Sequence, residues 1–131
     1  MGYCVDVVVE NLVIPAENID ACLQAITALH GTDGSRSFSW VNAIGSDKYE
    51  DLIAAFRNWR YEAEMQNGDV AVLYFRGEKS GSDEELFRCI APFTRHSETA
   101  YITYRGEDGC QWRYVIGNGK FREETGVTTW E

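Results

Sequence analysis

The sequence predicts one α+β domain built mainly on an antiparallel sheet, with about three helices packed on one face. Three observations lead to this fold class: helical periodicity in separate segments, an Asn67-Gly68 pair between two extended runs, and short alternating stretches in the last third of the chain. The 131 residues are 44% hydrophobic and include only two prolines, as is typical of a globular protein. We therefore expect a single domain over residues 1–131.

The first strand and the first helix are expected in the opening part of the chain. Residues 3–13 are rich in β-branched side chains and too interrupted by polar residues for a long helix, so they predict a strand. Pro15 then opens a helix, because apolar residues recur at the helical interval from Ile19 to Leu29. Gly31 is expected to end this helix in a left-handed conformation.

A short strand and a second helix are expected next. Residues 38–41 favour a strand. The pattern Asp47-x-x-Glu50 is typical of a capping box, in which each side chain satisfies the other residue's backbone N–H. The second helix is therefore predicted to run from Lys48 to about Asn58.

The clearest local signal is the Asn67-Gly68 pair, which separates extended runs at 59–66 and 69–75. This pair is favoured in a two-residue type I′ turn, because both positions need a positive φ angle. We therefore expect a β-hairpin at this place in the chain.

The two faces of this hairpin differ in composition. A regular two-residue turn places Glu62 and Glu64 on the same face as Leu73 and Phe75. We expect the more apolar opposite face to point to the core; it contains Tyr61, Ala63, Met65, Val70, Val72 and Tyr74. The mixed face is then either a partner-binding patch or a surface covered by another element.

The second half of the chain predicts a third helix followed by a meander. Ser82-x-x-Glu85 has the spacing of a capping box, and the apolar series after it stops near Pro92. Short alternating stretches separated by glycine-containing turns then predict four strands, at 99–105, 110–116, 120–123 and 127–130. The predicted element order is β-α-(β)-α-β-β-α-β-β-β-β.

The sequence contains no motif that predicts a catalytic, cofactor-binding or metal site. The cysteines lie in apolar stretches without a C-x-x-C pair and are expected to be small buried residues; they are Cys4, Cys22, Cys89 and Cys110. His30 and His96 lack the spacing of metal ligands. We expect no cofactor and, on balance, no enzymatic activity.

The net charge of −9 is the most visible global feature. It argues against direct binding to the phosphates of nucleic acid. Two functional interpretations remain: a surface that imitates nucleic acid, or a surface that docks on the basic groove of a protein. The alternative is that the acids cap helices, occupy turns and keep the protein soluble.

The sequence also bears on location. No apolar segment approaches the ~18 residues that span a membrane. The first residues lack the basic and apolar regions of a secretory signal. We therefore expect a cytoplasmic protein that does not associate with a membrane.

Five residues are the candidates for contact with a partner protein. Glu62 and Glu64 supply carboxylates on the mixed hairpin face, and Phe75 is the expected apolar anchor beside them. Glu107 and Asp108 form a second acidic group in a turn between two glycines.

Several segments resemble short proteins of bacteria and their phages whose function is uncharacterised: Phe38–Val41, Trp59–Glu62, Leu73–Glu78 and Arg105–Tyr114. The resemblance extends over most of the chain and supplies no catalytic motif. It implies a binding role, because small acidic proteins of phages and mobile elements often block a host protein, as anti-CRISPR proteins do.

The sequence thus favours a small acidic binding protein that inhibits a host nucleic-acid-handling defence complex. Two alternatives stay open: a small enzyme or ligand-binding domain whose site is assembled from distant residues, and an immunity-type protein that neutralises a toxin. Exposed strand edges or aromatic residues would also support a homodimer.

Overall fold

The computed structural model describes residues 5–31, 34–37, 41, 44–45, 49–77, 83–107 and 109–125. Its helices and strands confirm the predicted α+β class and the predicted element order over this part of the chain. The elements are β1 (Val5–Glu10), the 3-10 turn η1 (Ala16–Asn18), α1 (Ile19–Ala28), α2 (Leu52–Asn58), β2 (Tyr61–Gln66), β3 (Asp69–Phe75), α3 (Asp83–Ile90), the 3-10 turn η2 (Ala91–Phe93), β4 (Ala100–Gly106), β5 (Gln111–Gly117) and β6 (Lys120–Thr125).

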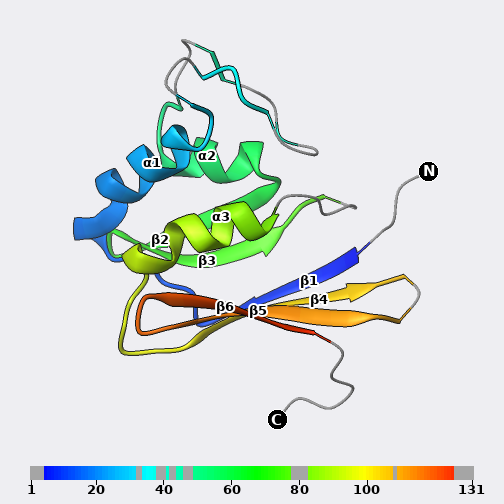
Figure 1. Cartoon of the computed structure of the whole chain (residues 1–131). Coiled ribbons are helices and arrows are strands. Elements are labelled where there is room, and N and C mark those ends of the chain that lie inside the picture. The colour runs from blue at the N-terminus through cyan, green and yellow to red at the C-terminus, as the bar shows by residue number, and fades with distance from the viewer. Residues whose placement is uncertain are drawn as a thin grey trace.

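The strands form two antiparallel sheets. A four-stranded sheet has the order β1-β4-β5-β6, and β2 pairs with β3 as a separate hairpin. Ile14, which follows β1, joins the two sheets through reciprocal backbone hydrogen bonds of 2.8 and 2.9 Å with Val70 of β3. The three helices and the hairpin lie on one side of the four-stranded sheet (Figure 1). No element that the structure describes covers the opposite face of that sheet.

The core lies between the four-stranded sheet and the helix-and-hairpin layer. Aromatic side chains fill much of it, because Tyr104 stacks on Trp112 and Tyr61 meets the edge of Phe87. The largest fully buried side chains are Trp59, Tyr61, Tyr104, Phe56, Phe87, Ile14, Ile26, Leu86, Ile90, Ile102, Ile116 and His30. Within the described residues, no helix is both long and apolar enough to cross a membrane.

The predicted turn residues adopt the expected backbone conformations. Gly31, three residues after the last residue of α1, has φ 86°, and its N–H donates to the Ala28 carbonyl at 3.1 Å, as expected for a glycine at a helix end. Asn67 and Gly68 have φ 54° and 87°, the pattern of a type I′ turn. Asn118 and Gly119 repeat this pattern between β5 and β6, with φ 54° and 75°.

The start of the second helix differs from the prediction. Residues 49–51 are not helical, and α2 begins at Leu52. The cap is Asp51, whose backbone is extended and whose Oδ1 accepts a 2.8 Å hydrogen bond from the Ala54 N–H. The predicted capping box was therefore wrong about Glu50, because the adjacent carboxylate satisfies the first turn instead.

Several predicted features fall wholly or partly outside the described residues. Asp47 and Ser82 lie outside them, as do residues 38–40 of the predicted short strand and the predicted strand at 127–130. The last residue of that short strand, Val41, is described and buried.

The hairpin is irregular, and this changes which of its residues face the core. Tyr61, Glu62, Ala63 and Glu64 stand opposite Phe75, Tyr74, Leu73 and Val72, but the register shifts before Met65, which stands opposite Val70. Ala71 is therefore the extra residue of a β-bulge, and a bulge reverses the alternation of faces on the longer strand.

The prediction of the core face was consequently wrong for part of β3. Leu73 is buried and Phe75 half-buried, on the same face as Tyr61, while Tyr74 is 40% exposed. Met65 stands opposite buried Val70, so it keeps its predicted face, but at 46% exposed it does not lie in the core. Phe75 therefore points away from Glu62 and Glu64.

Candidate functional site

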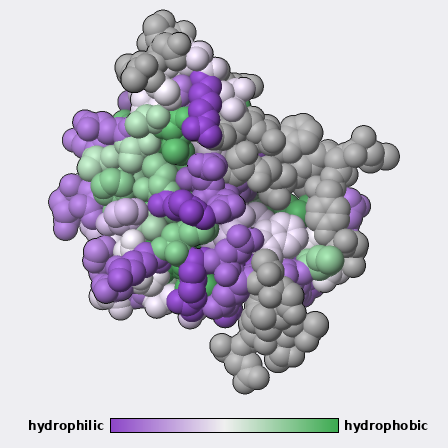
Figure 2. Space-filling model, in the orientation of Figure 1, coloured by the Kyte–Doolittle hydropathy of each residue, from purple (hydrophilic) through white to green (hydrophobic). Residues whose placement is uncertain are grey.

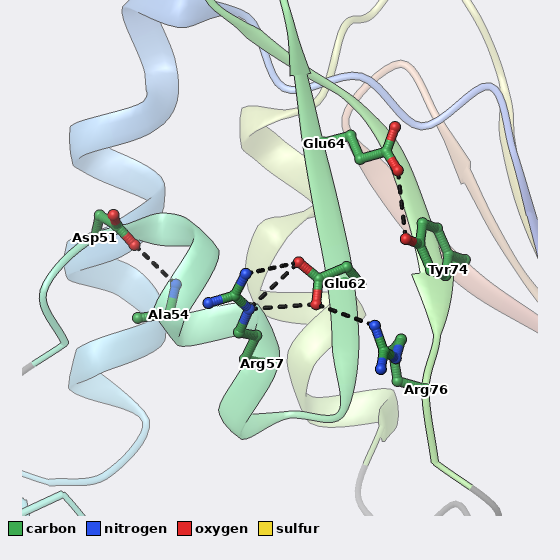
Figure 3. Close-up of polar contacts among 7 residues, drawn as sticks. All are labelled: Asp51, Ala54, Arg57, Glu62, Glu64, Tyr74 and Arg76. Carbon is green, nitrogen blue, oxygen red and sulfur yellow. Dashed lines mark hydrogen bonds and ion pairs between the residues drawn. The ribbon is translucent and has the colours of Figure 1, made fainter.

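Glu62 lies at the centre of an ion-pair group on the outward side of the hairpin (Figure 3). Arg57, at the end of α2, donates from Nε and Nη2 to Glu62 at 3.2 and 3.0 Å. Arg76, just after β3, brings Nη1 within 3.7 Å of the same carboxylate. The hydrogen bonds from Arg57, assisted by the charges of Arg57 and Arg76, lower the pKa of Glu62. Glu62 is thus ionised and accompanied by two cations.

Exposed apolar side chains lie beside this ion-pair group. Tyr74 stands opposite Glu62 in the hairpin, and its hydroxyl donates to Glu64, farther along β2, at 3.3 Å (Figure 3). Tyr74 and Met65 are two of the three large hydrophobic side chains that are exposed among the described residues. We call Glu62, Glu64, Val72 and Tyr74 the outer hairpin face, because the register places these four residues on one side of the hairpin.

The five residues proposed from sequence lie in different places. Glu62 and Glu64 share the outer hairpin face, as expected. Phe75 is on the other face, with its ring 5.1 Å from that of Tyr61. Glu107 is exposed in the turn between β4 and β5, and Asp108 lies outside the described residues. The structure therefore brings only the first two together.

A second group of charged and polar residues is buried between the two sheets. Asp83, the first residue of α3, is 1% exposed. Its Oδ1 accepts from Arg60 Nη2 at 2.5 Å. Its Oδ2 accepts from the hydroxyls of Tyr61 at 2.6 Å and Tyr104 at 3.1 Å. Because Tyr61 belongs to β2 and Tyr104 to β4, the carboxylate of α3 joins both sheets.

The local fold explains why Arg60 reaches Asp83. Arg60 has φ 72°, a left-handed conformation that turns the chain directly from α2 into β2. Its N–H donates to the Arg57 carbonyl at 2.9 Å, and its own carbonyl accepts from the Arg76 N–H at 2.8 Å. The guanidinium also lies over the Phe75 ring, with Cζ 5.7 Å from the centroid. This turn directs Arg60 inward, while Arg57 and Arg76 remain outside.

The chemistry of the Asp83 group favours a structural role. Burial, followed by the charge of Asp83, raises the pKa of Tyr61 well above its ordinary value. Burial, followed by the neighbouring Tyr61 and Asp83, does the same for Tyr104. Both phenols therefore stay protonated and donate hydrogen bonds at neutral pH. Since both carboxylate oxygens already have donors, Asp83 is not arranged to take a proton from a substrate.

Sequence reasoning missed this group. From its sequence position, Asp83 is only one of several acids at a predicted helix start, where the helix dipole favours anions. Its partners lie 21 to 23 residues away along the chain. No local spacing connects them, so only the tertiary fold reveals the cluster.

The cysteines have different environments. Burial raises the pKa of Cys22 to about 12 and that of Cys89 to about 11, so both are poor nucleophiles at neutral pH. The expectation of burial was wrong for Cys110, which is exposed because β5 begins one residue later. Cys4 lies outside the described residues. Within the described part of the chain, no group of three His, Cys, Asp or Glu residues is placed to hold a metal ion.

Two shallow depressions are present on the described surface. One, of about 480 Å³, lies between α3 and β6; its charged lining consists of Arg88, Lys120, Arg122 and Glu123. The other, of about 410 Å³, lies near the hairpin tip and contains Asp69, Glu98 and Arg95. Arg95 forms ion pairs with both of those carboxylates. His96 is exposed and bonds the Pro92 carbonyl at 3.3 Å, so it does not join either set of acids.

The charges are distributed unevenly over the molecule. The uncovered face of the four-stranded sheet, which we call the outer sheet face, consists of Asp6, Val8, Glu10, Tyr101, Thr103, Arg105, Gln111, Arg113, Val115, Lys120, Arg122 and Glu124. It holds four of the chain's 12 cations but only three of its 21 acids. The other residues that the structure describes include six cations and 13 acids, so the acidity of the described part of the chain is concentrated away from this face.

The view in Figure 2 shows how the helix-bearing side is composed. An apolar area lies over α1, and hydrophilic side chains interrupt it and surround it. Four acids on or next to the helices, Glu17, Asp20, Glu50 and Glu85, form no ion pair with another described residue. This side therefore combines uncompensated acids with apolar surface.

Comparison with known proteins adds no family to these observations. No protein-family model, no curated protein and no solved structure matches the chain.

Proposed function

We propose that this protein is a non-enzymatic binding protein whose acidic helix-and-hairpin side docks on a basic surface of a partner protein. The observation that carries this proposal is the uneven charge distribution, because the described residues outside the outer sheet face include 13 acids and six cations. A surface of one sign attracts a partner of opposite sign and speeds their encounter. A basic groove that holds the phosphates of nucleic acid has the required charge.

The outer hairpin face is the proposed contact within this side. Tyr74 is 40% exposed on this face, and aromatic residues are enriched at the centres of protein interfaces. Tyr74 takes the role of apolar anchor that sequence reasoning gave to Phe75, because the bulge turns Phe75 toward the core. Glu64 is the carboxylate beside this anchor, so the partner should offer a cation next to an apolar pocket.

The proposed consequence of docking is inhibition. A protein that occupies a phosphate-binding groove excludes nucleic acid from it. The resemblance of several segments to short proteins of bacteria and their phages supports a host defence complex as the target. An immunity-type protein would use the same physical contacts against a toxin, and the identity of the captured partner separates these two roles.

Affinity capture from host-cell lysate tests the proposal. Tagged protein should retain a stoichiometric partner at low salt and lose it at high salt, because salt screens exposed charges. Added double-stranded DNA or RNA should compete with the protein for that partner. Capture that withstands both high salt and competing nucleic acid would contradict docking on a phosphate-binding groove.

Two charge-matched variants locate the contact. Glu64→Gln, alone or combined with Tyr74→Ala, should weaken capture. Glu10→Gln removes the same charge from the outer sheet face, so it should leave capture unchanged. Equal loss in Glu64→Gln and Glu10→Gln would show that net charge alone matters and that the outer hairpin face is not the contact.

A further inference from the structure

The β1 strand is an unusual sheet edge for this molecule. It pairs with β4 on one side, and no described strand of its sheet pairs with its other side. Its sequence is Val-Asp-Val-Val-Val-Glu, and Val8 is 57% exposed, the most exposed large hydrophobic residue among those described. An apolar edge strand with free backbone groups favours pairing with another strand.

The other edges carry features that discourage such pairing. The β6 edge is highly charged, with Lys120, Arg122, Glu123 and Glu124 in six residues. The β2 edge packs next to α2 and carries Glu62 with Arg57. The β3 edge has a bulge and is occupied at Val70 by Ile14. These are recognised means of protecting edges, and β1 has neither a bulge nor a lysine or proline.

We propose that β1 pairs antiparallel with β1 of a second copy of the chain, so that two four-stranded sheets form one continuous sheet across a two-fold axis. The second copy is favoured because the strand is complementary to itself. In such a pair, opposed residues must lie on the same side of the joined sheet. Alternate residues of a strand lie on the same side of a sheet, so two opposed positions of β1 must be an even number of residues apart. In every allowed register, one residue therefore lies on the two-fold axis, opposite the same residue of the other copy.

Charge and the length of strand that is paired select one of these registers. With Val8 on the axis, Asp6 of each chain stands opposite Glu10 of the other, and like charges directly opposite each other are unfavourable. With Asp6 on the axis, the two Asp6 residues oppose each other. With Val7 on the axis, valine opposes valine on the inner face, and Asp6 opposes Val8 on the outer face. With Val9 on the axis, Val8 opposes Glu10 without a clash of charges, but only residues 8–10 of β1 are paired, whereas Val7 on the axis pairs residues 5–9. The proposed dimer therefore has Val7 on the axis.

The surroundings of β1 suit contact between two acidic chains. Asp6 stands opposite Arg105 within the sheet, so a cation accompanies it on the outer sheet face. This face as a whole has a slight excess of cations. At physiological ionic strength the remaining acids act only over about 8 Å. Repulsion between the acidic layers is therefore weak at this edge.

Sedimentation equilibrium on the full chain tests the proposal. The apparent mass should rise from that of one chain to that of two as the concentration approaches about 1 mM, because a small interface gives a weak dimer. Val8→Glu places a glutamate opposite Asp6 of the other copy and should abolish dimerisation. Val8→Lys places a lysine opposite the same aspartate and should preserve or strengthen it.

Controls make the variants interpretable. Val8 is largely exposed, so neither substitution should unfold the chain, and circular dichroism checks this. Thr103→Glu adds the same charge one strand in from the edge and should leave the dimer intact. A chain that stays monomeric at every concentration overturns the proposal and leaves a strand of another protein as the alternative occupant. Dissociation by Val8→Lys as well as Val8→Glu overturns the register.

Discussion

Asp83 and Glu62 both bind arginine side chains, but they lie in opposite environments. The Asp83 side chain is 1% exposed and that of Arg60 15%, between two sheets and a helix. The Glu62 side chain is 18% exposed, and its partners Arg57 and Arg76 are 64% and 62% exposed. A buried charge that loses its partner is costly, whereas an exposed pair contributes little. We infer that the first group maintains the fold and the second is available for contacts.

The largest expected effect is on the buried group. Asp83→Asn keeps the side-chain shape but leaves the Arg60 charge without its carboxylate. The free energy of unfolding should fall by about 3 kcal/mol, the lower end of the range for breaking a buried ion pair. Urea denaturation at neutral pH measures this. Arg60→Met combined with Asp83→Asn removes both charges and should recover part of the lost stability. If Asp83→Asn alone left stability unchanged, the buried Asp83 pair would matter no more to the fold than the exposed Glu62 pair.

The two buried phenols predict a loss of stability at alkaline pH. In the unfolded chain tyrosine ionises near pH 10, whereas folding raises the pKa of both Tyr61 and Tyr104. Their contribution is therefore fully present below pH 10 and declines as pH rises above it. Above pH 10, and until the phenol also ionises in the folded chain, each phenol should lower the free energy of unfolding by about 1.4 kcal/mol per pH unit.

Urea denaturation at about pH 8 and about pH 11 measures this dependence. Tyr104→Phe lowers stability at both values by losing a hydrogen bond. It should nevertheless show a smaller difference between them than the natural chain, because one ionising phenol has been removed. An equal difference would show that Tyr104 ionises in the folded state as it does in the unfolded chain.

A smaller effect is expected at the start of α2, where an exposed carboxylate binds backbone rather than arginine. Asp51→Ala removes the acceptor for the Ala54 N–H and should lower the free energy of unfolding by about 1 kcal/mol. Glu50→Ala is the matched control, because Glu50 is the adjacent acid that the sequence pattern favoured. A greater loss in Glu50→Ala than in Asp51→Ala would restore the predicted capping box.

Sequence predicted the features that depend on neighbouring residues. The Asn67-Gly68 turn and Gly31 at the helix end need only their own positive φ angles, so composition revealed them. The bulge at Ala71 depends on how two strands meet, and it alone reversed the predicted positions of Tyr74 and Phe75. The contacts of Asp83 also depend on how distant segments meet, because its partners belong to β2, β4 and the turn before β2. The sequence around Asp83 therefore gave no sign of them.

The candidate contact was predictable only in part. Glu62 and Glu64 lie before the bulge, so the alternation of β2 placed them correctly on one face. Their partners come from elsewhere: Arg57 from the end of α2, Arg76 from beyond β3, and Tyr74 from the reversed part of β3. Sequence therefore identified the carboxylates but not the cations or the aromatic ring that determine their properties.

The smallest expected effect on stability is at Glu62 itself. Glu62→Gln should leave the urea midpoint at neutral pH unchanged, because its arginines are well exposed and water replaces the carboxylate. The pKa of Glu62 is lowered in the folded state, so whatever it contributes is present above its ordinary pKa and is lost as pH falls below it.

The same substitution should nevertheless change partner binding. It leaves Arg57 and Arg76 uncompensated beside Glu64, which makes the outer hairpin face positive and repels a basic groove. Capture should therefore weaken at low salt while the folding transition stays in place. A variant that loses stability but still binds would reverse the roles assigned to the two arginine–carboxylate groups, because Glu62 would then support the fold rather than the contact.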